Sequence, residues 1–92
     1  MVFGMKEFLE SQMKLHHSMN VFGVTSYLFS QDGKFAVYSK DQIYGETCHF
    51  LSFQIAQGTW YFPLLDKLEE RFGKYDRSYD KNGLTYYVWR AK

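Results

Sequence analysis

Two pairs of adjacent residues carry side chains that could do chemistry, namely His16-His17 and Cys48-His49. Imidazole binds zinc and transfers protons near neutral pH, and a thiol activated by imidazole is a nucleophile. Adjacent residues of a helix point about 100° apart, so His16 and His17 do not form the i, i+4 pair that holds zinc. Neighbours on a strand point to opposite faces, so Cys48 and His49 cannot pair directly. We therefore predict no metal site and no catalytic residue, and we interpret Cys48 as structural.

A group of carboxylates, Asp66, Glu69 and Glu70, lies among Lys67 and Arg71. Such mixed charges at helical spacing are typical of a solvated helix face. General acid or base catalysis needs a carboxyl group whose environment shifts its pKa, and nothing in the sequence indicates one. Phosphate-binding glycine loops and nucleophile elbows are also missing from the sequence. We expect a protein that is not an enzyme and that uses no cofactor.

Length and composition indicate one folded domain, residues 1–92. The chain is 46% hydrophobic and 23% charged, which differs from the pattern of disordered segments. Its single cysteine excludes an internal disulfide framework and favours a reducing compartment. No stretch approaches the roughly 18 apolar residues of a membrane span, and the N-terminus lacks the apolar core of a signal peptide. We expect a cytoplasmic protein without a membrane partner.

The spacing of apolar residues predicts two helices. Met5, Phe8, Leu9 and Met13 form one stripe within residues 4–20, and Asn20 is a suitable end for that helix. A second helix is predicted over residues 63–73, where a proline occupies the first turn and a glycine ends the helix.

Strands are predicted in the remaining apolar runs. Asp32-Gly33 separates two β-branched and aromatic segments, which indicates a hairpin that pairs Phe29 with Ala36, Leu28 with Val37, and Tyr27 with Tyr38. Residues 47–56 alternate, with His49, Leu51, Phe53 and Ile55 directed inward. Residues 74–83 are interpreted as a polar loop, and a last strand follows from Leu84. The order α-β-β-β-α-β predicts an α+β fold in which two helices pack on one face of a mainly antiparallel four-stranded sheet.

The other face of that sheet is the predicted site. Aromatic residues make up 21% of the chain, more than a small core needs, and large exposed apolar patches mark interaction surfaces. From the hairpin and the third strand we expect Tyr27, Phe29, Tyr38, Lys40, Phe50, Ser52 and Gln54 outward. The last strand adds either Tyr87 with Trp89 or Tyr86 with Arg90. The alternative is that the last strand is central or that residues 41–46 fold over this face, in which case the rings belong to the core. The partner-binding residues that we predict are Tyr27, Tyr38, Lys40, Tyr87, Trp89 and Arg90.

These features favour a small protein-interaction or regulatory module that binds a protein partner or itself, and we expect a homodimer. The second hypothesis is a domain that binds single-stranded nucleic acid, with bases stacked on exposed rings and phosphates contacting Lys34, Lys40, Arg90 and Lys92. A net charge of only +1 argues against the second hypothesis.

Overall fold

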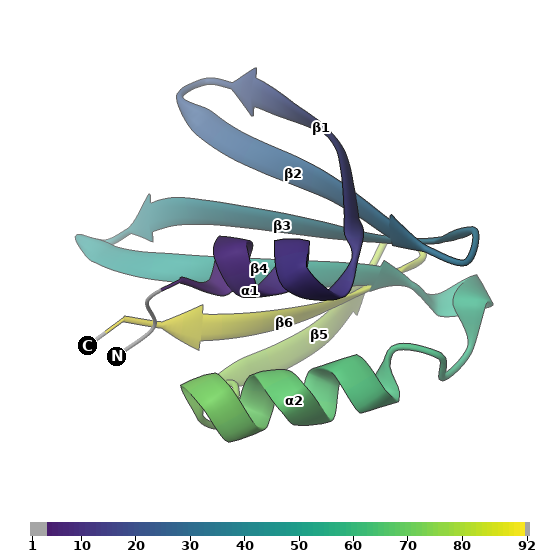
Figure 1. Ribbon diagram of the computed structural model, residues 1–92. Helices are drawn as coiled ribbons and strands as arrows, with labels where there is room; N and C mark the ends of the chain where they lie inside the picture. Colours follow the sequence, from purple (N-terminus) through teal and green to yellow (C-terminus); the bar gives the residue numbers. More distant parts are fainter. Residues whose placement is uncertain (1–3, 92) are drawn as a thin grey trace.

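The computed structural model describes residues 4–91, which form two α-helices, one short 3-10 helix and a six-stranded sheet (Figure 1). In chain order the elements are α1 (Met5–Gln12), β1 (Lys14–Val21), β2 (Val24–Gln31), β3 (Lys34–Ile43), β4 (Glu46–Gln54), η1 (Ile55–Gln57), α2 (Phe62–Phe72), β5 (Arg77–Lys81) and β6 (Leu84–Arg90). The strand order is β1-β2-β3-β4-β6-β5, and every neighbouring pair is antiparallel. The α+β class is therefore confirmed, but the sheet has six strands rather than the predicted four, and the element order differs.

The first of the two added strands replaces half of the predicted first helix. The helix ends at Gln12, and Met13 is already extended. The apolar stripe of the helix stops at this point, and β1 instead forms a ladder with β2 that closes with Val21 opposite Val24. Since most helical stability comes from tertiary packing, a segment without a further apolar stripe can satisfy its backbone better in a sheet.

Strand β1 was not predicted because the turn that follows it, Phe22-Gly23, has no recognisable turn sequence. Phe22-Gly23 and Tyr44-Gly45 each join two strands, and all four residues have positive φ, with 52° at Phe22 and 51° at Tyr44. Two successive residues of positive φ form the type I′ turn that suits antiparallel hairpins. Aromatic residues rarely adopt this conformation, so neither dipeptide is a turn signal in the sequence.

The second added strand, β5, lies in the segment that was predicted to be a loop. It is a polar edge strand that pairs Tyr79 with Tyr86 and Lys81 with Leu84 across the Asn82-Gly83 turn. Charged side chains on a short edge strand discourage pairing with further chains, and they also hide the apolar alternation that identifies a strand.

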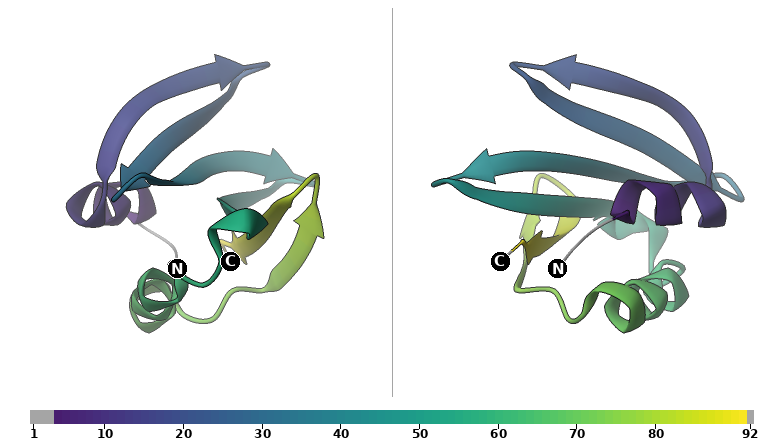
Figure 2. Two further views of the ribbon diagram at one scale, coloured as in Figure 1. Left: turned by 90° about the vertical axis from the view of Figure 1, so that its right-hand side faces the viewer. Right: turned by 60° about the vertical axis from the view of Figure 1, so that its left-hand side comes forward.

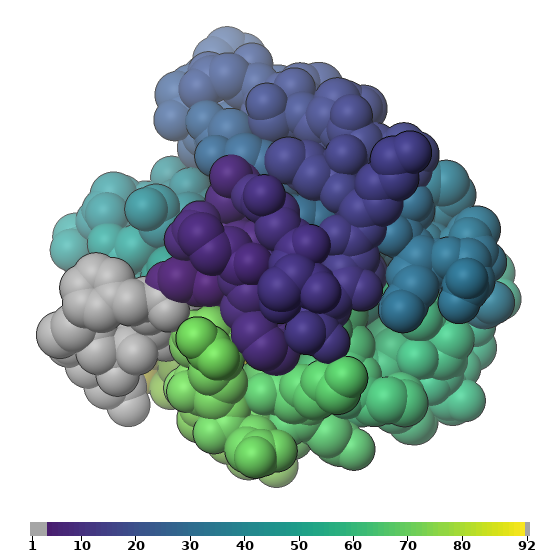
Figure 3. All heavy atoms as spheres, in the orientation of Figure 1, coloured from purple at the N-terminus to yellow at the C-terminus, as the bar shows by residue number. Residues whose placement is uncertain are grey.

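Both helices pack on one face of the curved sheet, as the two further views make clear (Figure 2). Figure 3 looks onto this side, where α1 and α2 lie against each other in front of the strands. The ring centroids of Phe8 in α1 and Phe72 in α2 are 5.9 Å apart. Beneath the helices the core contains Phe29, Leu51, Phe53 and Trp89, each at most 1% exposed. The prediction of two helices on one face is confirmed.

The register of the predicted hairpin is also confirmed, because Phe29 lies opposite Ala36, Leu28 opposite Val37, and Tyr27 opposite Tyr38. Here the Asp-Gly turn was recognised, and counting outward from it gives the pairs.

Candidate binding face

The sheet has a covered face, under the helices, and an open face without helices. Alternation and the observed pairing assign each strand residue to one of them. Tyr38, Tyr87 and Trp89 lie on the covered face and are 4%, 7% and 1% exposed. The predicted placement of these three rings on an exposed face is therefore wrong, and they belong to the core. The same correction applies to Phe29, which was also predicted to face outward and is fully buried.

The other predicted site residues divide between the two faces. Tyr27 is half-buried on the covered face, where its ring stacks on Tyr38 at a centroid distance of 6.1 Å. Lys40 is exposed beside the same group, opposite His49 in the sheet register. Only Arg90 lies on the open face. The structure therefore does not bring the six predicted residues together.

The prediction assigned the hairpin and the last strand to the wrong faces because the polar atoms of Tyr and Trp were expected to stay in contact with water. In the fold the polar atoms of Tyr38 and Trp89 find partners. The Tyr38 hydroxyl is 2.7 Å from His49 Nδ1, and Trp89 Nε1–H donates to the carbonyl of Gly73 over 2.8 Å. A large ring whose polar atom is paired can be fully buried, so these residues fill the space between the sheet and the helices.

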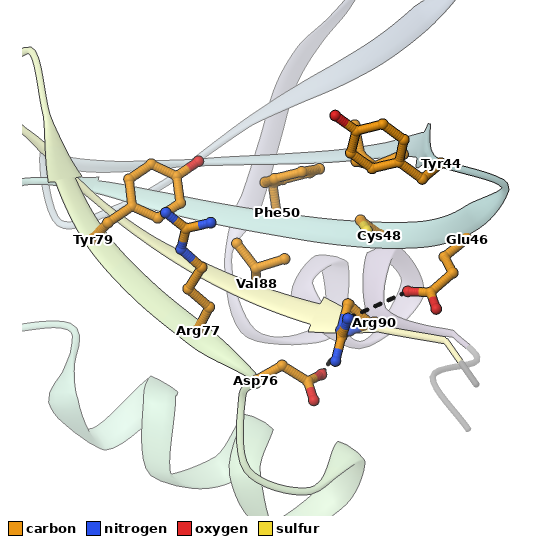
Figure 4. Close-up of a pocket in the computed structure, with 10 residues that line it drawn as sticks. Tyr44, Glu46, Cys48, Phe50, Asp76, Arg77, Tyr79, Val88 and Arg90 are labelled. Carbon is orange, nitrogen blue, oxygen red and sulfur yellow. Dashed lines mark hydrogen bonds and ion pairs between the residues drawn. The ribbon is translucent and has the colours of Figure 1, made fainter.

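The open face contains a hollow of about 860 Å³ at the end where β3 turns into β4 (Figure 4). Phe50 and Val88 lie side by side on its floor, and Tyr79 and Arg77 rise from β5 on one side. The full set of lining residues is Ile43, Tyr44, Glu46, Cys48, Phe50, Asp76, Arg77, Tyr79, Val88 and Arg90. The hollow thus has an apolar floor and a charged rim, as binding sites commonly have.

Charges of both signs surround this hollow. The Arg90 guanidinium lies 3.6 Å from the Glu46 carboxylate, and the Arg90 backbone N–H donates to Asp76 over 2.8 Å. The Arg77 guanidinium lies 5.1 Å from the centroid of the Tyr79 ring, and within residues 4–91 it has no ion-pair partner. Arg77 therefore remains available to a carboxylate from outside.

Apolar character extends from this hollow across the open face. The rings of Tyr79 and Tyr86 stack with centroids 5.0 Å apart and planes 11° apart. Towards the opposite end of the strands, Leu28, Phe35 and Val37 line a second hollow of about 310 Å³. Sequence reasoning missed Tyr79 and Arg77, although counting outward from Asn82-Gly83, as at Asp32-Gly33, would have placed Tyr79 opposite Tyr86.

The residues first considered for chemistry are separated by the fold. Cys48 is buried on the open face and His49 is buried on the covered face, as the alternation predicts. Burial raises the pKa of Cys48, and the nearby Glu46 carboxylate acts in the same direction, so the group stays a thiol at neutral pH. His16 lies in β1, with Nε2 2.5 Å from the Ser30 hydroxyl. Within residues 4–91 no cluster of three acidic, histidine or cysteine side chains could hold a metal.

No known protein family, curated protein or solved structure matches the chain. Neither helix of the described residues has the length and apolar character needed to cross a membrane.

Proposed function

We propose that this protein is a non-enzymatic protein-interaction module that binds through the open face of its sheet, and that its partner there is a second copy of the same chain. The observation that supports the proposal most directly is the hollow of about 860 Å³ with Phe50 and Val88 on its floor. At its rim lies Arg77, which has no ion pair with any residue of the described range 4–91. A sheet face that is merely solvated is normally polar, whereas apolar hollows with a charged rim are typical of interfaces.

The balance of charge favours a second copy over nucleic acid. Around the hollow, Arg77 and Arg90 are matched by Glu46 and Asp76. A polyphosphate chain would meet two carboxylates there and release few counterions. A twofold interface, in contrast, requires one patch to be complementary to itself, which two positive and two negative groups allow.

The hairpin between β3 and β4 supplies an element that could enter the partner's hollow. Tyr44 at its tip is fully exposed and has a positive φ, so within residues 4–91 burial does not compensate this strained ring. Glu46 follows two residues later and is half-exposed. In a twofold arrangement across this rim, Tyr44 would cover the apolar floor of the partner, and Glu46 would pair with Arg77 of the other copy.

Light scattering at several protein concentrations measures the solution mass and tests the proposal. The decisive comparison is between charge-reversal variants and the unchanged chain. We expect a dimer that Tyr44→Asn and Arg77→Glu each weaken at least tenfold, as expected for anchors of an interface. Adding Glu46→Lys to Arg77→Glu should restore the dimer, because the pair is then reversed. Phe22→Asn changes the equivalent turn position of the other hairpin, and Lys81→Glu makes the same change of charge elsewhere on β5, so both serve as matched controls.

Three results would contradict this reading. A chain that remains monomeric at all concentrations excludes the second copy. A double variant that dimerises no better than Arg77→Glu excludes the proposed ion pair. A monomer whose mass shifts when a mixed single-stranded oligonucleotide is added, with steep loss in salt, would favour nucleic acid instead.

A further inference from the structure

A third hollow, on the covered face, contains a buried pair of polar rings that the proposed dimer does not use. It has a volume of about 480 Å³ and lies between the first turn of α1 and strands β2, β3 and β4. Tyr38 and His49 form part of its wall and are only 4% and 5% exposed. Their rings stack with centroids 6.0 Å apart, and the Tyr38 hydroxyl contacts His49 Nδ1 at 2.7 Å.

The direction of this hydrogen bond follows from the protonation of the two rings. Burial raises the pKa of Tyr38 far above its usual value, and burial, followed by the charge of Lys40, lowers the pKa of His49. Both rings are therefore neutral at pH 7. Among the described residues the Tyr38 hydroxyl has no other hydrogen-bond partner, so it must donate to Nδ1 if its proton is not to be buried without an acceptor. The imidazole proton then lies on Nε2.

Nε2–H of His49 is thus a donor in a side chain that is more than nine-tenths buried, and no residue of the described chain accepts from it. Other donors share the hollow. Lys40 lies directly opposite His49 in the sheet, and Thr25 and Lys6 also line the space. The first-turn amides of α1 have no side-chain cap.

One acidic residue, Glu7, lies among the same lining residues, whereas Lys6 and Lys40 bring two positive charges. Lys6 is held in place, since it pairs with Glu10 and lies 5.1 Å from the centroid of the Tyr27 ring. Because Lys6 is paired with Glu10, the other lining charges are Lys40 and Glu7, one of each sign. His49 Nε2–H and Lys40 are the donors that a ligand would meet, and the half-buried Tyr27 supplies an apolar wall.

We propose that this hollow binds a small molecule through a carboxylate or phosphate group, with His49 Nε2–H as the donor and Lys40 as the cation at the mouth. Tyr38 is a positioning residue, because its hydroxyl sets which nitrogen of His49 carries the proton. The site lies on the opposite side of the sheet from the proposed dimer contact, so either can fail without the other.

Nuclear magnetic resonance of the intact chain tests the site at constant ionic strength, with inorganic phosphate and acetate as separate probes. In the free protein we expect the Nε2–H form of His49 in long-range imidazole spectra. Millimolar amounts of one probe should shift the His49 ring and the amides of Met5–Glu7 to saturation, and which probe does so distinguishes phosphate from carboxylate. Lys40→Gln should weaken binding about two- to fivefold, whereas Lys81→Gln, with the same change of charge, should not. His49→Phe should weaken it tenfold or more.

Three outcomes would overturn the proposal, and none depends on the stability of a core variant. The first is a His49 ring protonated on Nδ1. The second is the absence of saturable shifts with both probes. The third is an equal loss in Lys40→Gln and Lys81→Gln, which would mean that the probes respond only to net charge.

Discussion

The substitution Trp89→Ala tests whether the Trp89 side chain in β6 belongs to the core or to a binding surface. The side chain is 1% exposed, and its Nε1–H donates to the carbonyl of Gly73 at the end of α2 over 2.8 Å. Truncating a buried Trp costs about 3–5 kcal/mol, and a further loss of about 1 kcal/mol follows if the carbonyl stays buried without a partner. A domain of this size is stable by roughly 5–14 kcal/mol, so the substitution should remove a large part of the total.

Urea unfolding followed by circular dichroism measures this loss. With a slope of about 2 kcal/mol per M, the midpoint should fall by about 2 M. Tyr79→Ala is the control on the open face, where the ring is half-buried, stacks on Tyr86 and lies beside the Arg77 guanidinium. It should cost about 1 kcal/mol or less. If Trp89→Ala lowered the free energy of unfolding by less than about 1 kcal/mol and abolished self-association, the assignment of Trp89 to the core would be refuted.

Two further predictions concern strain and protonation. Tyr44→Asn and Phe22→Asn should each raise the free energy of unfolding of the monomeric chain by about 0.5–1 kcal/mol, because Asn tolerates positive φ better than an aromatic residue. The measurement is a urea titration of chains diluted until they are monomeric. Unchanged urea midpoints would contradict the strain at these two turns. Because the pKa of His49 is lowered by burial and then by Lys40, the unfolded chain takes up a proton below about pH 6.5 that the folded chain does not, so stability should fall as pH decreases from about 7.5 to 5.5. Urea midpoints across this range should fall less in His49→Phe, and equal slopes would show that His49 is not the cause.

Sequence reasoning succeeded where the signal was local. The Asp32-Gly33 turn needs only its own two residues to adopt positive φ, so the hairpin and its register could be predicted. The alternation in β4 and the stripe of α2 are likewise properties of short windows. It failed at Phe22-Gly23 and at β5, because the first turn uses an aromatic residue at positive φ and the second strand is almost entirely polar.

The sequence alone determined the α+β class, the opposite facing of Cys48 and His49, and the high aromatic content. Only the tertiary structure decided which rings are buried. Burying a tyrosine or tryptophan costs less free energy when a distant group pairs with its polar atom, as His49 pairs with Tyr38 and Gly73 with Trp89. Such partners lie 11 and 16 residues away along the chain and come together only when the sheet and helices pack.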